Sequence, residues 1–461
     1  MRSIAAFPPS CVRQPDHAES ISRRLAEIEM AKRISISSAA GALPLLVLAY
    51  ALLMLHYVFS RAFRDSLLGS HLSVAALPGL TFLGTLLAIT LSLTLSFFFR
   101  TELRIRVIRV FYCINAISET SFAFGYKAHP WMYSGYYIEV SASTALGLSL
   151  IWILIGDWMS RCNARDTGKV PAILICGTSA GMFAGFGLVH LPSAANFRVA
   201  NLTLASMNIA VVLTLLLYRN SYCNVQVAPP IREEVEKALR HWTSPVTRTL
   251  AAVTVFGASA STLLDLAFRV GVAEHFTQQA ARLHFLGLFQ GLLSLGSLLS
   301  QLVLQNAGTS KLGRACLTIH PLTMTVAASL GMIVPIFPIL AILRAGEYSL
   351  RNSVFRCGVE MVYAILPDKL RIETRPLIDV VGERVGDMIA AGLLALLLMG
   401  NSQLGYRWSF LVFSILGYAL WVLSRWLLHR VNQMAEAFEA VKKRAEAVPL
   451  HRMAREGAVL A

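Results

Sequence analysis

Long apolar runs alternate with short polar segments along most of the chain. An α-helix needs roughly 20 apolar residues to cross the hydrocarbon layer of a bilayer. Runs of this kind predict spans near 39–60, 74–98, 106–125, 136–158, 170–191, 198–218, 249–271, 282–305, 314–334, 336–364, 376–399 and 406–427. The pattern therefore predicts an all-α integral membrane protein with about 12 transmembrane helices.

A polar stretch at 219–248 interrupts this pattern near the middle of the chain. It contains Pro229-Pro230 followed by a charged run at 232–237, which is typical of a linker. The first 38 residues are mostly polar and carry no cleavable signal-peptide pattern. We therefore expect a cytoplasmic segment 1–38, a six-helix bundle 39–218, a cytoplasmic linker 219–248, a second six-helix bundle 249–427 and a cytoplasmic amphipathic tail 428–461.

Composition agrees with a membrane protein. Of the 461 residues, 56% are hydrophobic and 15% are charged, whereas a soluble domain has roughly 25% charged residues. The formal net charge of +15 comes from Lys and Arg that concentrate in the termini and in alternate loops. The positive-inside rule then places both termini in the cytoplasm, and we expect a bacterial inner (plasma) membrane. No motif that reads nucleic acid accompanies the charge, so nucleic acid is not an expected partner.

Enzymatic chemistry has no sequence support. The 7 cysteines are scattered without a C-x-x-C pair, so neither a disulfide framework nor a zinc site is expected. The chain also lacks an H-E-x-x-H motif, a G-x-S-x-G motif and a P-loop. We expect no cofactor, no metal and no direct pumping by ATP hydrolysis.

Two segments of the chain repeat at one offset. Residues 62–64 (Ala-Phe-Arg) recur 205 positions later as 267–269, which makes Arg64 and Arg269 equivalent. The glycines of one span recur at the same offset in another, Gly177 and Gly181 matching Gly382 and Gly386. The repeat predicts two pseudo-symmetric bundles with a substrate site between them. Each pair of glycines has a G-x-x-x-G spacing, which predicts close helix packing, and we expect it at the interface between the halves.

Ionisable side chains inside the predicted spans are the candidate functional residues, because a charge in the bilayer needs a partner or water. In the span 336–364, the i, i+4 spacing pairs Glu347 with Arg351 and Arg356 with Glu360. In the span 376–399, three carboxylates share one predicted helical stripe, with Arg384 beside them: Asp379, Glu383 and Asp387.

Two interpretations of these charges stay open. In one, they line a water-filled cavity that binds a charged solute, and the substrate-binding residues are Arg64, Arg269, Glu347, Arg351, Glu119 and Asp265. In the other, they are ion pairs that latch helices together or gate the cavity, as we expect for Arg356, Glu360, Asp379, Glu383, Arg384 and Asp387.

Several of these segments resemble a known family. The stretches 347–356, 360–367 and 375–387 are similar to the tenth and eleventh spans of the ATP/ADP translocase (nucleotide exchanger) group, and more closely to its bacterial relatives in the major facilitator superfamily. Residues 264–269, 274–276 and 285–287 with Gln301 resemble the seventh and eighth spans, and 64–68 resemble the end of the first. The sequence departs from the family in lacking its lysine-rich pattern and in carrying Phe99-Arg100 where many major facilitators have a glycine–aspartate loop.

The resemblance implies a twelve-helix transporter related to nucleotide exchangers. We therefore expect a secondary transporter of a small anionic solute, such as a nucleotide or another phosphorylated or organic anion, that works by alternating access of two bundles. Its expected partners are the solute and the lipid bilayer. The alternative is a non-transporting scaffold or sensor that keeps the fold and binds partners through its tails, which an apolar stripe in 424–448 opposite basic residues motivates.

Overall fold

The described part of the chain is helical throughout. A computed structural model describes residues 43–98, 104–159, 170–191, 193–219, 245–306, 309–365, 377–400 and 406–446. It contains twelve helices, and the described residues form no strand beyond an isolated bridge between Leu68 and Leu72. The predicted fold class is confirmed.

The helices fall into two sets of six. The first set is the helix Leu43–Ser66 (hereafter the first helix), α2 (Leu77–Phe98) after a short turn η1 (Val74–Ala76), α3 (Arg104–Gly125), α4 (Trp131–Met159), α6 (Val170–Val189) and α7 (Phe197–Arg219). The second set is α9 (Pro245–His275), α10 (Gln279–Asn306), α11 (Thr309–Gly331), α12 (Phe337–Leu350) continued by η2 (Arg351–Phe355) and α13 (Arg356–Ile365), then η3 (Leu377–Gly382) with α15 (Glu383–Gly400), and α16 (Tyr406–Glu446). We call these sets the N half and the C half.

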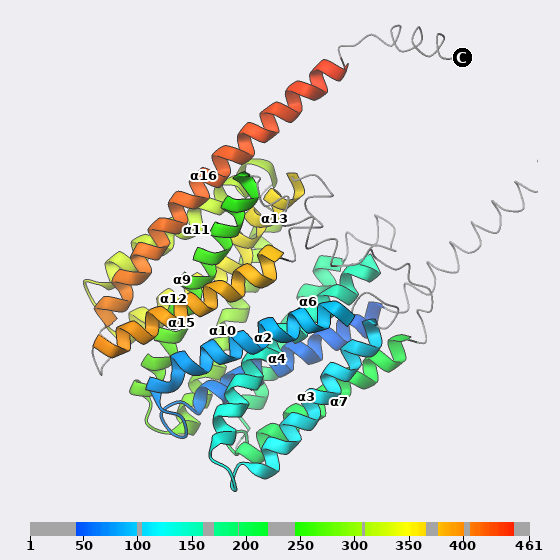
Figure 1. Cartoon of the computed structure of the whole chain (residues 1–461), viewed down its shortest axis with the longest axis vertical. Coiled ribbons are helices and arrows are strands. Elements are labelled where there is room, and N and C mark those ends of the chain that lie inside the picture. Colours follow the sequence, from blue (N-terminus) through cyan, green and yellow to red (C-terminus); the bar gives the residue numbers. More distant parts are fainter. Residues whose placement is uncertain are drawn as a thin grey trace, which may run out of the picture.

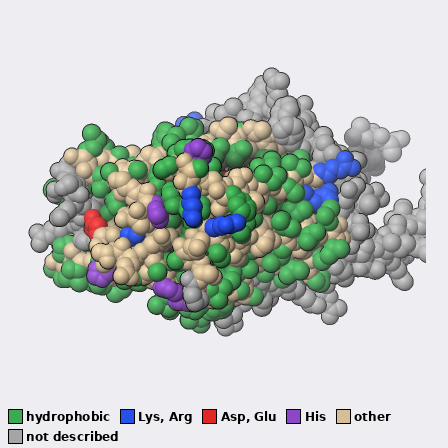
Figure 2. Space-filling view, turned by 90° about the horizontal axis from the view of Figure 1, so that it is seen from below, with side chains coloured by type: hydrophobic (Ala, Val, Ile, Leu, Met, Phe, Trp, Pro, Cys, Tyr) green, Lys and Arg blue, Asp and Glu red, His purple; other side chains and the backbone are tan. Residues whose placement is uncertain are grey.

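Membrane character is visible in the outer surface of the helices. Five helices in the described residues are long and apolar enough to cross a membrane by length and composition. Large apolar side chains such as Leu217, Leu292 and Ile342 are exposed, which a lipid environment tolerates and water does not. On the face shown in Figure 2, hydrophobic and uncharged groups cover most of the described surface. The chain is an integral membrane protein.

The two halves repeat the same helix pairings. In the N half α3 packs on α7 and α2 on α4, and in the C half α11 packs on α16 and α10 on α12. The halves meet through two further equivalent pairs, α6 with α10 and α2 with α15. The internal sequence repeat therefore corresponds to a repeat in three-dimensional packing.

Gly181, Gly382 and Gly386 pack inside their own halves, which differs from the expected location between the halves. The surroundings of Gly177 lie outside the described residues. A Cβ on Gly181 of α6 would collide with the backbone carbonyl of Ala51 in the first helix. A Cβ on Gly386 of α15 would collide with that of Val255 in α9. The two crossings are equivalent, so each glycine lets two backbones approach closely within its own bundle.

The hydrophobic cores show which ends of the halves touch. One core contains residues of both halves, among them Phe63 and Phe197 of the N half and Phe268 and Phe337 of the C half. A second core is built from the N half alone, and a third from the C half alone. The shared core lies at the end of the bundles that carries the loops 67–73, 190–196 and 276–278, which we call the joined end. Toward the other end the halves diverge, as Figure 1 shows.

Two helix ends differ from the predicted spans. The first helix runs to Ser66 rather than stopping near residue 60, and the turn after it is made by Gly69 at a φ of 78°, a conformation that glycine adopts readily. The last helix, α16, continues unbroken to Glu446 and projects beyond the other helices (Figure 1). No Gly or Pro lies between residues 418 and 446 to end it, so the amphipathic segment extends the last span instead of starting a separate surface helix.

Closure of the joined end generates the first prediction. A Cβ on Gly287 of α10 would collide with Val189 of α6, in the opposite half. We expect Gly287→Leu to push the halves apart there. Spin labels at Lys127 and Gln278, in loops of opposite halves at this end, should then give longer distances in double electron–electron resonance. The matched control is Gly187→Leu, because nothing lies within 4 Å of a Cβ at Gly187. Equal distances in the two variants would contradict the assigned closure.

Candidate functional site: an ion-pair network between the halves

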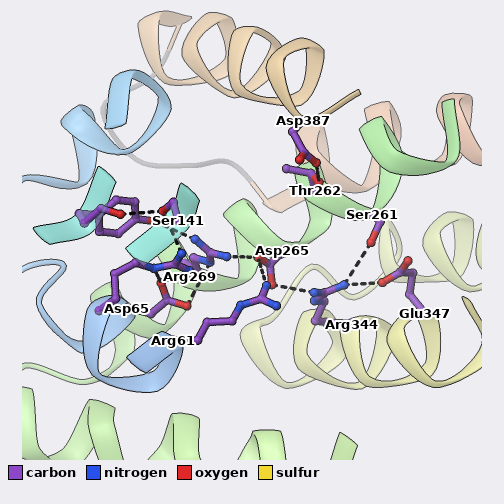
Figure 3. A network of polar contacts seen from close by, with 12 residues as sticks. Arg61, Asp65, Ser141, Ser261, Thr262, Asp265, Arg269, Arg344, Glu347 and Asp387 are labelled. Atoms are coloured by element: carbon purple, nitrogen blue, oxygen red, sulfur yellow. Dashed lines mark hydrogen bonds and ion pairs between the residues drawn. The ribbon is translucent and has the colours of Figure 1, made fainter. Parts of the chain in front are cut away.

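A network of charged side chains joins the halves next to the shared core. Its centre is Asp265 of α9, whose carboxylate accepts from Arg61 of the first helix (Nη2 to Oδ2, 2.8 Å) and from Arg344 of α12 (Nη2 to Oδ1, 2.8 Å). Arg269, one turn further along α9, also pairs with Asp265. One carboxylate thus links three arginines from three helices and both halves (Figure 3).

Asp65 of the first helix forms the second centre. It accepts from its neighbour Arg64 (Nε to Oδ1, 2.8 Å) and lies 3.2 Å from Nε of Arg269. The two arginines also contact α4, where Arg64 donates to Ser141 (2.9 Å) and Arg269 to the hydroxyl of Tyr137 (2.8 Å). Arg64 and Arg269, equivalent in the sequence repeat, therefore converge on one carboxylate.

Burial makes this network energetically demanding. Arg64, Asp65, Asp265 and Arg269 are each at most 8% exposed. Bringing a charge out of water costs several kcal/mol after relaxation, about 3–5 kcal/mol being lost when one partner of a buried pair is removed. The network completes itself at Glu347, which pairs with Arg344. These pairings hold the two halves together, because separating the halves without admitting water would leave buried charges unpaired.

The network carries one formal positive charge in excess. Its cations are Arg61, Arg64, Arg269 and Arg344, and its anions are Asp65, Asp265 and Glu347. The described residues add no fourth carboxylate to these contacts. A buried cationic excess favours a negative charge nearby.

Arg61 is the edge of the network. Its side chain is 15% exposed, more than the side chains of Arg64, Arg269 and Arg344. It precedes Arg64 in the first helix, and at about 1.5 Å of rise per residue it lies roughly 5 Å further from the joined end. Its guanidinium stacks over the ring of Tyr57 (5.6 Å to the centroid), and Tyr348 of α12 lies within its electrostatic range. Arg61, which contacts Tyr57, thus borders the network on the side where the halves diverge.

The structure re-pairs residues for which sequence spacing predicted partners. Glu347 pairs with Arg344 at i, i+3 rather than with Arg351, which instead lies 3.7 Å from Glu383 of α15. Arg356 binds Asp379 (Nη2 to Oδ2, 3.0 Å). The side chain of Glu360 lies outside the described residues, so the pair of Arg356 with Glu360 stays a prediction.

A π-helical turn changes the predicted stripe of carboxylates. η3 contains Asp379 and ends just before Glu383. A π-turn inserts a residue into the 3.6-residue period, so Asp379 leaves the stripe that α-helical spacing predicts for it with Glu383 and Asp387. The three carboxylates accordingly have separate partners: Asp379 binds Arg356 and Tyr363, Glu383 lies near Arg351, and Asp387 binds Arg384 and Thr262.

Glu119 lies in a separate cluster. Its carboxylate contacts His56 of the first helix (2.7 Å) and accepts from Asn208 of α7 (2.8 Å), and neither residue belongs to the ion-pair network. The residues predicted as one substrate-binding set are therefore divided. Arg64, Arg269, Asp265 and Glu347 come together in the network, whereas Glu119 and Arg351 lie elsewhere.

Sequence reasoning missed several members of the site. The predicted span 39–60 leaves Arg61 outside it, because the apolar run ends near residue 60, although the helix continues to Ser66. Arg344 lies inside the predicted span 336–364, but the i, i+4 spacing favours Arg351 as the partner of Glu347. Tyr137 and Ser141 gave no signal, because an aromatic or small hydroxyl residue in an apolar span is unremarkable until its neighbours are known.

The central role of Asp265 generates the second prediction. Asp265→Asn removes a charge that three arginines share, and we expect a loss of about 3–5 kcal/mol of stability, read as a lower unfolding temperature in detergent. The matched control is Asp387→Asn, because its partner Arg384 is 25% exposed and a partly exposed pair contributes about 0–1 kcal/mol. Equal destabilisation by the two substitutions would contradict the central role.

Comparison with known proteins identifies the fold. No family model matches the sequence, and no curated protein matches it either. A bacterial homologue of the human lysosomal transporter Spinster, in an inward-facing and unoccupied conformation, is similar at a TM-score of 0.58 and 13% identity, covering 86% of this chain and 97% of that one.

Two further solved structures agree. The nucleoside transporter NupG has a TM-score of 0.60 at 12% identity, covering 83% of this chain and 98% of its own. A POT family transporter in complex with 5-aminolevulinic acid has a TM-score of 0.60 at 11% identity, covering 84% and 96%. The chain therefore has the twelve-helix, two-bundle fold of the major facilitator transporters.

Proposed function

We propose that this protein is a secondary transporter of a small organic anion and works by alternating access of its two halves. The observation that carries the proposal is the buried network with its cationic excess, which joins the halves at one end only. Solved structures of the same fold are transporters by their descriptions. We propose a transporter rather than an enzyme, because the scattered cysteines and the intramembrane charges match no catalytic motif.

The network suits a reversible gate. An apolar contact between the halves stabilises the joined end without directional preference, whereas ion pairs need defined partners. When the halves separate, water can replace each of these partners, because every member is a charged or hydroxyl group. In this proposal Arg64, Arg269 and Asp265 are mainly gating residues. Their side chains become accessible to the solute when the joined end opens.

The anion binds, in this proposal, at the edge of the network. Arg61 is its most exposed cation, and a guanidinium binds carboxylate and phosphate groups through two parallel hydrogen bonds. Tyr57 and Tyr348, whose rings lie under Arg61 and Arg344, border this position. The resemblance to nucleotide exchangers supports a nucleotide or another phosphorylated anion as the solute class.

Charges of the C half further from the joined end have a second role in the proposal. Arg351 and Glu383 are 26% and 34% exposed, although Arg351 lies 14 residues into a membrane-spanning helix, or about 21 Å from its start. Exposed charges at that depth require water. We assign Arg351, Glu383, Arg384 and Asp387, with Arg356 and Asp379, to the wall and the gate of the path that the solute takes on that side.

The predicted orientation completes the proposal. With both termini in the cytoplasm, the joined end faces outward and the diverging end faces the cytoplasm. The segments 1–38, 219–248 and 428–461 are then cytoplasmic. The middle segment links the bundles 39–218 and 249–427, and the other two flank them along the chain. A sensor or scaffold is the second candidate, favoured by α16, which projects past the bundle to Glu446 where a partner has access.

Flux through the purified protein tests the proposal. We expect proteoliposomes to exchange radiolabelled nucleotides, organic phosphates or carboxylates, and Arg61→Gln to weaken solute affinity by about 10–100-fold, since a hydrogen bond to a charged group contributes about 1.5–3 kcal/mol. The control is Arg198→Gln, whose guanidinium covers the ring of Phe124 away from the network. Absence of flux for all three solute classes would leave the sensor as the better candidate, and unchanged affinity in Arg61→Gln would remove the anion site.

A further inference from the structure

Two histidines of opposite halves face each other at the joined end. His190 directly follows α6 of the N half, and His284 lies in the second turn of α10 in the C half. Their Nδ1 atoms are 3.0 Å apart, whereas the centroids of the two rings are 5.0 Å apart and the ring planes differ by 26°. The two rings therefore point their Nδ1 edges at each other.

The helix crossing beside this pair sets the separation of the two backbones. On α10, His284 shares a face with Gly287 and Gly291, at i, i+3 and i+7. A Cβ on Gly287 would collide with Val189 of α6. A Cβ on Gly291 would lie 3.2 Å from the ring of Phe186, one turn earlier on α6. The two helices are therefore held in close contact, and the histidine at the end of each is brought to the other.

Solvent reaches the pair. His190 is exposed and His284 is half-buried, and the face shown in Figure 2, which looks onto the joined end, carries histidine side chains at its surface. The exposed His71 of the same end lies flat on the ring of Tyr133, with centroids 4.3 Å apart. In the pair, by contrast, nitrogen faces nitrogen, so its two Nδ1 atoms are available together to a ligand from water.

Two imidazole nitrogens at this separation match adjacent ligands of a transition-metal ion. With metal–nitrogen bonds of about 2.0–2.1 Å, a separation of 3.0 Å corresponds to an angle at the metal of roughly 94°, and the tetrahedral angle needs about 3.3 Å. Rotation of the two side chains, one of them exposed, supplies that difference. Neutral imidazole is the commonest metal ligand in proteins and suits Zn²⁺, Cu²⁺ and Ni²⁺.

The coordination chemistry needs no electron transfer. In the hydrogen-bonded pair one Nδ1 carries a hydrogen and the other has a bare lone pair. When a metal ion binds, that hydrogen moves through water to Nε2 of its own ring, and both Nδ1 atoms bond to the metal. Within the described residues no group of three or more His, Cys, Asp or Glu side chains is placed to hold a metal. The protein therefore supplies two ligands, and water completes the coordination.

We propose that His190 and His284 bind a divalent transition-metal ion of the Zn²⁺ class, which bridges the two halves and stabilises the closed joined end. Each half contributes one ligand, so the ion binds the closed arrangement more tightly than the open one and shifts the population toward it. Ligand spacing along the chain predicts no metal, because the two histidines are 94 positions apart. An effect of the ion on solute movement rests on the proposed transport function, whereas metal binding is measurable without any solute.

Electron paramagnetic resonance with Cu²⁺ tests the site in the full chain without an affinity tag. We expect the wild-type spectrum to show coupling to two nitrogens. His190→Ala and His284→Ala should each weaken Cu²⁺ binding by more than about 10-fold, since losing even an outer partner of a metal ligand costs 10–100-fold. The control is His71→Asn, which should leave binding unchanged. Wild-type binding no tighter than that of the double variant, or equal binding in either single variant, would overturn the site.

Distances across the joined end test the bridge. With spin labels at Lys127 and Gln278, we expect saturating Zn²⁺ to raise the short-distance population of the wild type, because the ion binds the closed state preferentially. A chelator should reverse the change, and His284→Ala should not respond. Distances that Zn²⁺ leaves unchanged, or changes equally in His284→Ala, would overturn the bridge. No solute is present, so failure here leaves the flux measurements unaffected, and absence of flux leaves the metal site unaffected.

Discussion

The arrangement of the two halves depends on one carboxylate, Asp265, which three arginines share. Inside a membrane protein each of these charges must have a partner, because neither lipid nor the apolar core can solvate it. The partners lie on the first helix, α9 and α12, so the pairing specifies where and in which register the halves meet. The aromatic core beside it excludes water and strengthens every one of these interactions.

This combination gives the joined end two kinds of contact. Apolar packing between Phe63, Phe197 and Phe268 supplies area without demanding one geometry. The ion pairs supply the geometry and a strong response to water. Away from this end each half has a core of its own, so the halves can move as units while their interiors stay packed. Alternating access requires a contact between the halves that is strong when water is excluded and that water can replace when the halves separate.

The pseudo-symmetry of the halves does not extend to the carboxylates of the ion-pair network. Arg64 and Arg269 are equivalent in the repeat, and both contact Asp65. The carboxylates have no such equivalents, because the 205-residue offset relates Asp265 to Ser60 and Asp65 to Val270. Packing positions such as Gly181 and Gly386 kept their equivalence. A symmetric scaffold thus holds an asymmetric set of charges, which is consistent with a site that binds an asymmetric solute.

The sequence by itself determined the membrane environment, the twelve helices and the internal repeat, because these follow from the length and spacing of apolar runs and from local glycine chemistry. It also indicated that intramembrane charges at Arg64, Asp265 and Arg269 need partners. Only the tertiary structure decided which partners they have. Side chains such as Arg344 and Asp265 are 79 positions apart, and a π-turn at 377–382 shifts the helical register of the carboxylates in the eleventh span. Helical periodicity describes neighbours along one helix, whereas a buried charge is satisfied by whichever helix packs against it.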